Sequence, residues 1–528
     1  MGSFCRTRHG LRPGLAALAA GLAGVVLLGA CHRDNEAVLD VAVVGAPADL
    51  AARGARLAPA GQLVQAATAQ GLVALDAQGQ VVPALADRWI VTDDGDSYIF
   101  RLRDGTWPDG TPLTAQGVAR ALRETFAALR GAPLGLELGD VDEVRAMTDR
   151  VLELRLRRPV PELLQVLAQP ELGLRRRGRG SGPLDVVRSA EARNAPAGAI
   201  AGPTGEVRLA EIPPARLGLV ADDEPPPASR QIRLRVMSAD AATAAFARGD
   251  VAVVLGGRFQ DLPLAQAAAG LSRRALQIDP SPGLFGLAVV EGGGPLAWPE
   301  FRDALAMAID RDALAAAIGL AGWASTTTIV PPGAGSAAPS DQGAGPGAEP
   351  RAAPPAWSAA SLETRRAEAL ARVARARARL GGRLPVLRLG WPQGPGADAV
   401  LARLTADFAA IGVTLARVPV EAPADLRLVD AVARYPGAMW YLNQLSCPAR
   451  RVVCDPVLDA RLAVARAERD SDRRAAMLAA VEAEFAAAGL FLPLGSPVRW
   501  SLARPGTPGF VLNPAAFHPL PWLAHPVD

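Results

Sequence analysis

The part of the sequence that most limits the possible folds is residues 71–126, a series of short strands and tight turns that opens into a helix. Three dipeptides in it are typical of tight turns between strands: Asp94-Gly95, Asp104-Gly105 and Asp109-Gly110. Between the first two turns the side chains alternate, with Tyr98, Phe100 and Leu102 on one face and arginines on the other. This alternation predicts a strand with one buried face, so the chain contains a sheet that is packed on one side.

Residues 1–30 have the pattern of an export signal peptide. A basic start precedes residues 15–30, an uncharged apolar run that is too short for a transmembrane helix, which needs about 20 residues. The run ends in Leu28-Gly29-Ala30-Cys31, which resembles the lipobox of bacterial lipoproteins, so we expect cleavage before Cys31 and lipidation of its sulfur. Acyl chains there would hold the protein at a membrane surface. The alternative is an ordinary signal peptide with an incidental cysteine.

Cysteine usage agrees with export to an oxidising compartment. Cys5 would leave with the signal peptide and Cys31 would carry lipid, so the mature body keeps Cys447 and Cys454. A disulfide between these two would close a small loop and contribute roughly 2–3 kcal/mol to stability. The alternative is a pair of metal ligands, which the absence of a nearby histidine disfavours.

The composition is that of a large folded protein and argues against an enzyme. Hydrophobic residues make up 50% of the chain and charged residues 21%, which excludes a largely disordered protein. The 56 basic and 53 acidic residues nearly cancel, so we expect no nucleic acid as a partner. None of the histidines belongs to a recognisable catalytic or metal-binding arrangement: His9, His32, His518 and His525. We expect no catalytic residue, metal or cofactor, although paired carboxylates stay open as an alternative.

The order of motifs along the chain is more specific than any one of them. The motifs are Gly71-Leu72-Val73, Pro83 to Trp89, Leu102 to Gly105, Asp109 to Ala115, Gly180 to Pro183, Phe246 to Val251, and residues 299–318. Together they resemble solute-binding protein family 5, the peptide- and nickel-type receptors of ABC importers. The resemblance implies an α/β fold with two lobes, of the periplasmic-binding-protein type (class II), with a subdomain inserted in the first lobe.

The resemblance also implies where the lobes begin and end. The expected segments are the signal peptide (1–30), the start of the first lobe (31–65), its inserted subdomain (66–175), its continuation (176–280), the second lobe (281–490) and a return to the first lobe (491–528). Within the second lobe, residues 331–356 are rich in Pro, Gly and Ala and are expected to form a flexible surface loop.

Helix and strand signals in the second lobe agree with an α/β arrangement. Residues 299–318 predict one helix with Phe301 and Leu305 on its packed face. A strand near residue 388, a helix over 397–410 and a following strand predict a βαβ unit of a mostly parallel sheet. The last helix is expected to start near residue 470 and to stop at Gly489.

The candidate ligand site comes from the resemblance. In peptide-binding members of the family, a Trp-x-x-Asp-Tyr-x-x-Pro segment supplies an aspartate for the amino terminus of the ligand. The counterpart here is 431–438, in which Arg434 stands in place of the aspartate. A guanidinium in the cleft would favour a carboxylate or phosphate over an ammonium group. Two alternatives stay open: Arg434 points to solvent, or the alignment slips and Asp430 supplies the anion.

Three aromatic residues complete the predicted ligand site: Tyr435, Trp440 and Tyr441. Rings of this kind could stack on a ligand, although neighbouring aromatic residues also commonly fill a core. A second departure from the family pattern is Gly117, where an aspartate is usual, and it puts one helix cap of the first lobe in question.

The resemblance implies a monomeric receptor that captures a peptide or another small solute between its lobes and closes by hinge motion. The closed form would dock on a membrane permease powered by a cytoplasmic ATPase, with the receptor lipid-anchored in the periplasm or cell envelope. The competing hypothesis is a non-transport lipoprotein, a scaffold or sensor partner that has kept the fold. The departures at Arg434 and Gly117 favour that alternative.

Overall fold

The computed structural model describes residues 38–50, 57–187, 205–213, 230–270, 274–332 and 350–524. The strands of these residues form a seven-stranded, a five-stranded and a four-stranded sheet, with two small hairpins. The expected signal peptide, Cys31 and most of the loop at 331–356 lie outside the described residues. Among the helices that are described, none has the length and apolar character needed to cross a bilayer.

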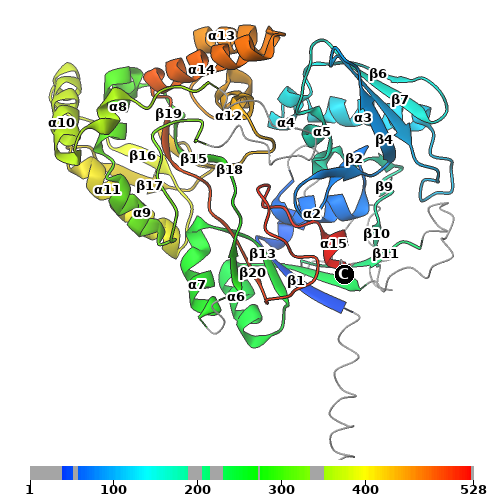
Figure 1. Cartoon of the computed structure of the whole chain (residues 1–528). Coiled ribbons are helices and arrows are strands. Elements are labelled where there is room, and N and C mark those ends of the chain that lie inside the picture. The colour runs from blue at the N-terminus through cyan, green and yellow to red at the C-terminus, as the bar shows by residue number, and fades with distance from the viewer. Residues whose placement is uncertain are drawn as a thin grey trace, which may run out of the picture.

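The seven-stranded sheet forms the base of the first lobe (Figure 1). Its strands, in spatial order, are β10 (Leu184–Val186), β11 (Glu206–Glu211), β12 (Gln231–Met237), β1 (Val38–Val44), β13 (Val253–Arg258), β20 (Arg499–Ala503) and β14 (Leu276–Ile278). The helices of this lobe are α2 (Pro59–Thr68), α6 (Ala239–Arg248), α7 (Leu262–Ala269) and α15 (Leu520–Ala524). Alternation along β1 sends Val41 and Val43 into the core with α2 and α15, and Ala42 into the core with α6 and α7.

The inserted subdomain is built on the antiparallel four-stranded sheet. Its order is β4 (Ala86–Val91), β5 (Ser97–Leu102), β7 (Val151–Leu156) and β6 (Val141–Ala146). The other elements are the hairpins β2 (Val73–Leu75) with β3 (Val81–Pro83) and β8 (Arg175–Arg176) with β9 (Arg179–Gly180), and the helices α3 (Ala115–Leu129), α4 (Pro133–Glu137) and α5 (Leu163–Leu167). The predicted alternation is confirmed, because Tyr98, Phe100 and Leu102 are buried.

Thr114 caps α3 by accepting a hydrogen bond from the Gly117 N–H, so the departure at Gly117 leaves this cap intact.

The five-stranded sheet forms the centre of the second lobe. Its order is β17 (Leu415–Val418), β16 (Leu387–Gly390), β18 (Leu426–Val432), β15 (Gly283–Val289) and β19 (Phe491–Gly495). The helices of the lobe are α8 (Pro299–Ala308), α9 (Arg311–Ile318), α10 (Leu362–Arg379), α11 (Pro395–Ala409), α12 (Ala438–Leu445), α13 (Pro456–Ala467) and α14 (Ser471–Ala488). Figure 1 shows α8 to α11 at the outer side of the lobe and α12 to α14 at its top. The predicted βαβ unit is confirmed as β16, α11 and β17, with the two strands parallel.

Two expectations about this lobe need correction. The sheet is mixed, because β16 pairs in parallel with β17 and β18 while β15 pairs antiparallel with β18 and β19. The chain also returns to the first lobe later than residue 491. The strand that begins there, β19, completes the second sheet, and β20 is the first strand to rejoin the first sheet.

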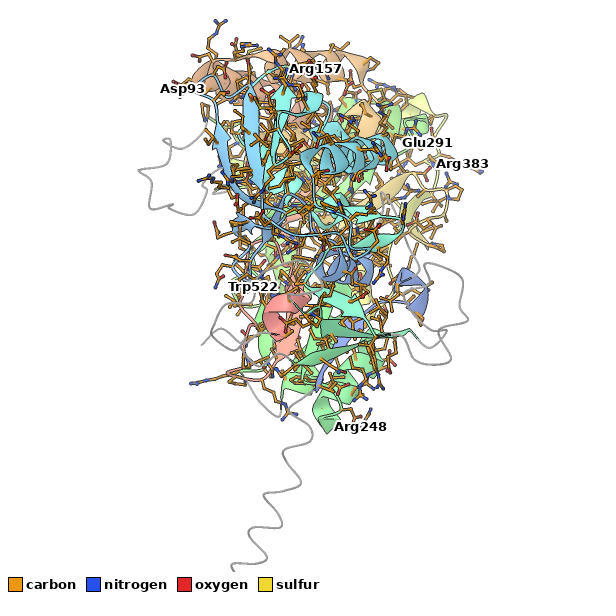
Figure 2. The ribbon with its side chains drawn as sticks, turned by 90° about the vertical axis from the view of Figure 1, so that its right-hand side faces the viewer. Asp93, Arg157, Arg248, Glu291, Arg383 and Trp522 are labelled. Atoms are coloured by element: carbon orange, nitrogen blue, oxygen red, sulfur yellow. A yellow bond between two sulfur atoms is a disulfide. The ribbon has the colours of Figure 1, made fainter. Side chains whose placement is uncertain are left out.

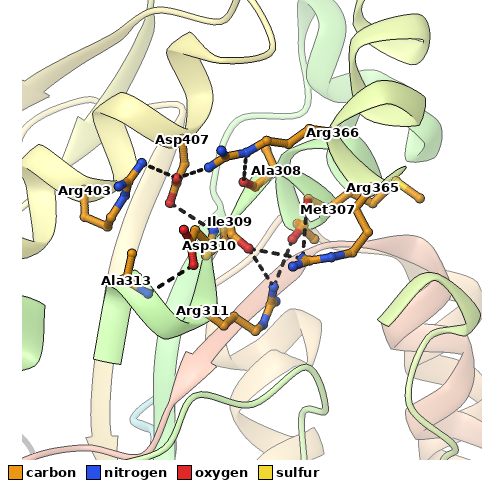
Figure 3. A network of polar contacts seen from close by, with 11 residues as sticks. Met307, Ala308, Ile309, Asp310, Arg311, Ala313, Arg365, Arg366, Arg403 and Asp407 are labelled. Carbon is orange, nitrogen blue, oxygen red and sulfur yellow. Dashed lines mark hydrogen bonds and ion pairs between the residues drawn. The ribbon is translucent and has the colours of Figure 1, made fainter. Parts of the chain in front are cut away.

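The single helix expected over 299–318 is two helices, α8 and α9, that meet at Ile309 and Asp310. Asp310 caps α9, since its carboxylate accepts a hydrogen bond from the Ala313 N–H at 3.0 Å. At the end of α8, Arg365 donates to the carbonyl oxygens of Met307 and Ile309, each at 3.1 Å. These side chains replace the backbone hydrogen bonds that a continuous helix would make (Figure 3).

A buried carboxylate, that of Asp407, connects the start of α9 to the neighbouring helices α10 and α11. The side chain of Asp407 on α11 is fully buried. It accepts hydrogen bonds from the Asp310 N–H at 3.1 Å and from Arg403 at 2.6 Å, and it also pairs with Arg366 of α10 (Figure 3). This network holds α9, α10 and α11 against one another.

Candidate functional site

A cavity of about 710 Å³ lies between the two lobes and the inserted subdomain. Its wall is formed by parts of α2, β13, β18, β20, α4 and α12, by the 3-10 helix Pro170–Leu172, and by loop residues near 450 and 516. Side chains from segments far apart in the sequence therefore face one space. The volume is in the range of pockets that enclose small organic ligands.

Arg434 lies in the cavity wall just after β18, and its charge is already paired. Its guanidinium donates to both carboxylate oxygens of Glu171, each at 2.9 Å, and to the Gln169 side-chain oxygen at 3.1 Å. Burial raises the pKa of Glu171, but the attraction and hydrogen bonds of Arg434, together with hydrogen bonds from a backbone N–H and from Gln62, lower it, and the net shift is downward. Arg434 therefore joins the second lobe to the first, and its guanidinium is not available as a free anion site in this state.

Tyr435 does not line the cavity, and it makes a second contact between the lobes. Its hydroxyl donates to Oε2 of Glu137 on α4, and the Asn443 side-chain amide donates to the same oxygen at 2.7 Å. Arg466 donates in turn to the Asn443 side-chain oxygen. Burial raises the pKa of Glu137 to about 7, while these donors and Arg466 act in the opposite direction.

The two other predicted aromatic residues differ in position. Trp440 lines the cavity, although only 2% of it is exposed, and its ring meets the ring of Tyr441 edge to face at 5.0 Å. Tyr441 is fully buried in the core that the subdomain shares with the second lobe. The structure thus places Arg434 and Trp440 at the cavity, and Tyr435 and Tyr441 behind its wall.

Three further charged residues form what we call the hinge cluster: Arg258, Asp430 and Arg499. Arg499 on β20 of the first sheet donates to Asp430 on β18 of the second sheet at 2.7 Å. Arg258, at the end of β13, stands directly opposite Arg499 in the antiparallel register. Asp430 was the alternative anion in the sequence, and the structure places it in the cavity wall beside these two cations.

Sequence reasoning missed most of the charged residues of the wall: Glu137, Glu171, Arg258 and Arg499. No spacing or motif marks any of them. The one available signal concerns Arg258, which lies at the carboxyl end of a largely buried strand, the end at which α/β sheets commonly bind ligands.

The structure contains a disulfide between Cys447 and Cys454, with the two Cα atoms 4.6 Å apart. It closes the loop that places Ala449, Arg450 and Arg451 in the cavity wall. Within the described residues, no group of three or more His, Cys, Asp or Glu side chains is arranged to hold a metal ion.

Comparison with known proteins agrees with this architecture. The sequence profile described as bacterial extracellular solute-binding proteins, family 5 Middle, matches residues 80–445. A stretch of 121 residues is 36% identical to the probable deoxycholate-binding periplasmic protein YgiS of Escherichia coli and covers 20% of this chain and 23% of that protein. A stretch of 119 residues is 30% identical to the periplasmic oligopeptide-binding protein OppA of the same species and covers 19% of this chain and 22% of that protein. The chain thus spans less than a quarter of the length of these curated relatives.

Solved structures extend the likeness of fold to nearly the whole chain. The murein tripeptide binding protein MppA of Escherichia coli superposes with a TM-score of 0.73 at 18% identity, covering 91% of this chain and 97% of that one. The OppA protein of Burkholderia pseudomallei gives a TM-score of 0.72 at 17% identity, with 93% and 99% covered. The relatives and the structural neighbours are substrate-binding proteins, not enzymes. This chain belongs to the bacterial extracellular solute-binding proteins of family 5.

Proposed function

We propose that this chain is the extracytoplasmic receptor of an ABC importer, which captures a peptide or another small solute and delivers it to a membrane permease. The observation that carries the proposal is the cavity of about 710 Å³, because both lobes and the subdomain contribute side chains to its wall. A solute bound there contacts both lobes at once and therefore stabilises the closed form. Two relatives, named as an oligopeptide-binding protein and a probable deoxycholate-binding protein, support a small organic solute.

One observation favours a second candidate, a non-transport lipoprotein that acts as a scaffold or sensor partner. The lobes are joined directly by the contacts of Arg434 with Glu171 and of Tyr435 with Glu137. Such contacts hold the lobes together without a bound solute, so closure by itself does not require one.

Ligand binding separates the two candidates. The full-length chain is purified without refolding, inspected by native mass spectrometry for a co-purified solute, and screened by thermal shift. The panel is tri-alanine, N-acetyl-tri-alanine, N-acetyl-tri-alanine amide, deoxycholate and Ni²⁺. A receptor gives a saturable rise in melting temperature, since a ligand at about 100 times its Kd adds roughly 2.7 kcal/mol. No co-purified solute and no shift with any compound would favour the scaffold.

The lipid anchor and the delivery step are tested in cells. Cys31→Ser is expected to move the protein from the membrane fraction to the soluble periplasmic fraction and to remove the mass of the acyl chains. Cys5→Ser is the matched control and leaves both unchanged, because Cys5 lies in the expected signal peptide. If the protein delivers its ligand to a permease, cells that lack the gene for this protein should not take up the labelled ligand. Expression of the wild-type protein should restore uptake. Unchanged membrane association of Cys31→Ser would refute the anchor.

A further inference from the structure

Among the described residues that line the cavity, most buried charges are paired. Arg434 is paired with Glu171, and Arg499 with Asp430. Glu421 and Arg450 are exposed at the rim, where water solvates their charges. Arg451 also lines the cavity and is not without a partner. This leaves Arg258 as the cation whose partner has to be explained.

The Arg258 side chain is half-buried in the cavity wall, and no described residue accepts a hydrogen bond from its guanidinium. It faces Arg499 across the antiparallel pair of β13 and β20, and like charges in directly opposed positions are unfavourable. Burial lowers the pKa of Arg258 and Arg499 adds to this shift, while the attraction of Asp430, Asp261 and Asp49 opposes it. Within the described residues, none of these three carboxylates forms an ion pair with the Arg258 guanidinium. The hinge cluster therefore holds two cations and one anion.

Asp430 does not supply the missing partner. One of its carboxylate oxygens accepts from Arg499, and the other is buried without a hydrogen-bond partner among the described residues. No ion pair joins Asp430 to Arg258 within the described part of the chain, so their attraction acts over a longer distance. An anion placed against Arg258 would give its guanidinium the direct partner that none of these carboxylates provides.

The wall offers no comparable place for an ammonium group. The carboxylate of Glu171 is occupied by Arg434 and by the Gln62 side-chain amide. A cation beside Asp430 would lie close to Arg258 and Arg499. Oε2 of Glu137 is occupied by Tyr435 and Asn443, and its Oε1 is buried without a hydrogen-bond partner among the described residues. Burial also raises the pKa of Glu137 to about 7, which favours the protonated, uncharged carboxyl.

We infer that the cavity takes a small ligand with one carboxylate and no charged amine, and that the carboxylate binds the guanidinium of Arg258. An N-acylated peptide or another simple organic acid has this chemistry, whereas a peptide with a free amino terminus does not. The inference rests on the proposed function, because it names the ligand class for the same cavity.

The test compares probes that share one backbone, with isothermal titration calorimetry on the full-length chain. N-acetyl-tri-alanine is expected to bind about 10-fold to 100-fold more tightly than its amide, the effect of one hydrogen-bonded charge pair. Free tri-alanine is expected to bind more weakly than the acetylated acid, because it carries a charged amine. If deoxycholate is the compound that binds, the same comparison uses its methyl ester.

Substitutions at Arg258 test whether this residue causes the tighter binding of the acid than of the amide. R258Q is expected to bind the acid no better than the amide, and R258K, which keeps a cation, is expected to retain part of the preference. R383Q is the control, because Arg383 is exposed at the outer edge of the molecule (Figure 2) and should leave both affinities unchanged. Circular dichroism on each variant shows whether it is folded.

The outcomes distinguish this inference from the proposed function. Equal affinities of acid and amide, binding of the free amine as tight as or tighter than that of the acetylated acid, or a preference that survives in folded R258Q would each overturn the inference and leave the receptor function standing. No binding of any probe and no co-purified solute would overturn both.

Discussion

The guanidinium of Arg434 spans the interface between the lobes and donates to both carboxylate oxygens of Glu171, each at 2.9 Å. The Glu171 side chain is 1% exposed and the Arg434 side chain 30% exposed. Removal of the arginine therefore leaves a buried carboxylate without its cation, which costs more than the pair itself contributes.

We predict that Arg434→Gln weakens the closed form by about 1–3 kcal/mol, a value reduced from that of a fully buried pair because the arginine is partly in solvent. The variant should open in solution, which small-angle X-ray scattering detects as a larger radius of gyration. The double variant Arg434→Gln/Glu171→Gln should recover much of the loss, because no charge is then left buried. Equal radii for the wild type and the single variant would show that the pair does not hold the lobes.

The sequence predicted the position of Arg434 but could not predict its partner. The resemblance placed the residue at the cleft with a reversed charge, and the structure places it in the cavity wall. Glu171 is 263 residues away in the sequence, and nothing in its surroundings marks it as a partner. Pairing across lobes depends on how they pack, which local patterns do not encode.

A second prediction concerns pH and Glu137. Burial raises the pKa of Glu137 to about 7 from an ordinary value of 4.5, so the folded protein holds a proton that the unfolded chain releases at lower pH. The contribution of this group to stability is therefore fully present below about pH 4.5 and falls as the pH rises to about 7. The difference over this window is on the order of 2–3 kcal/mol.

Glu137→Gln resembles the protonated carboxyl, since its amide oxygen can accept from Tyr435 and Asn443 as Oε2 does now. We expect the variant to lose this part of the pH dependence in urea unfolding between pH 5 and pH 8. Glu143→Gln, at an exposed position on β6, is the control and should keep the wild-type profile. Parallel profiles for Glu137→Gln and the wild type would contradict the assignment.

Local signals predicted local structure well in this chain. The ends of α6 and α14 fall at Gly249 and Gly489, where φ is +84° and +63°, a conformation that glycine adopts readily. The break between α8 and α9 was missed because apolar spacing continues through residue 309. The break depends on arginines of α10 and on Asp407 of α11, which are distant in the sequence.

A third prediction concerns Asp407, whose buried side chain joins α9, α10 and α11 (Figure 3). Asp407→Ala leaves Arg366, Arg403 and the Asp310 N–H without their shared acceptor, and we expect a loss of about 3 kcal/mol in the free energy of unfolding. Urea denaturation followed by circular dichroism measures it. The matched control is Asp312→Asn on α9, an exposed acidic residue that should change stability by less than about 0.5 kcal/mol. Similar losses for the two variants would mean that the network adds little.

The last prediction concerns the loop closed by Cys447 and Cys454, which are seven positions apart. On the chain-entropy model a disulfide that closes a loop of this size contributes about 2–3 kcal/mol to stability. The variant Cys447→Ser/Cys454→Ser should therefore unfold at a lower urea concentration, with an unchanged slope of the unfolding free energy against urea concentration. Because the loop carries Arg450 and Arg451 in the cavity wall, the double variant should also bind its ligand more weakly, with faster dissociation. Treatment of the wild type with a reductant should reproduce both effects and leave the double variant unaffected. An effect of reductant on the double variant would point to a target other than this bond.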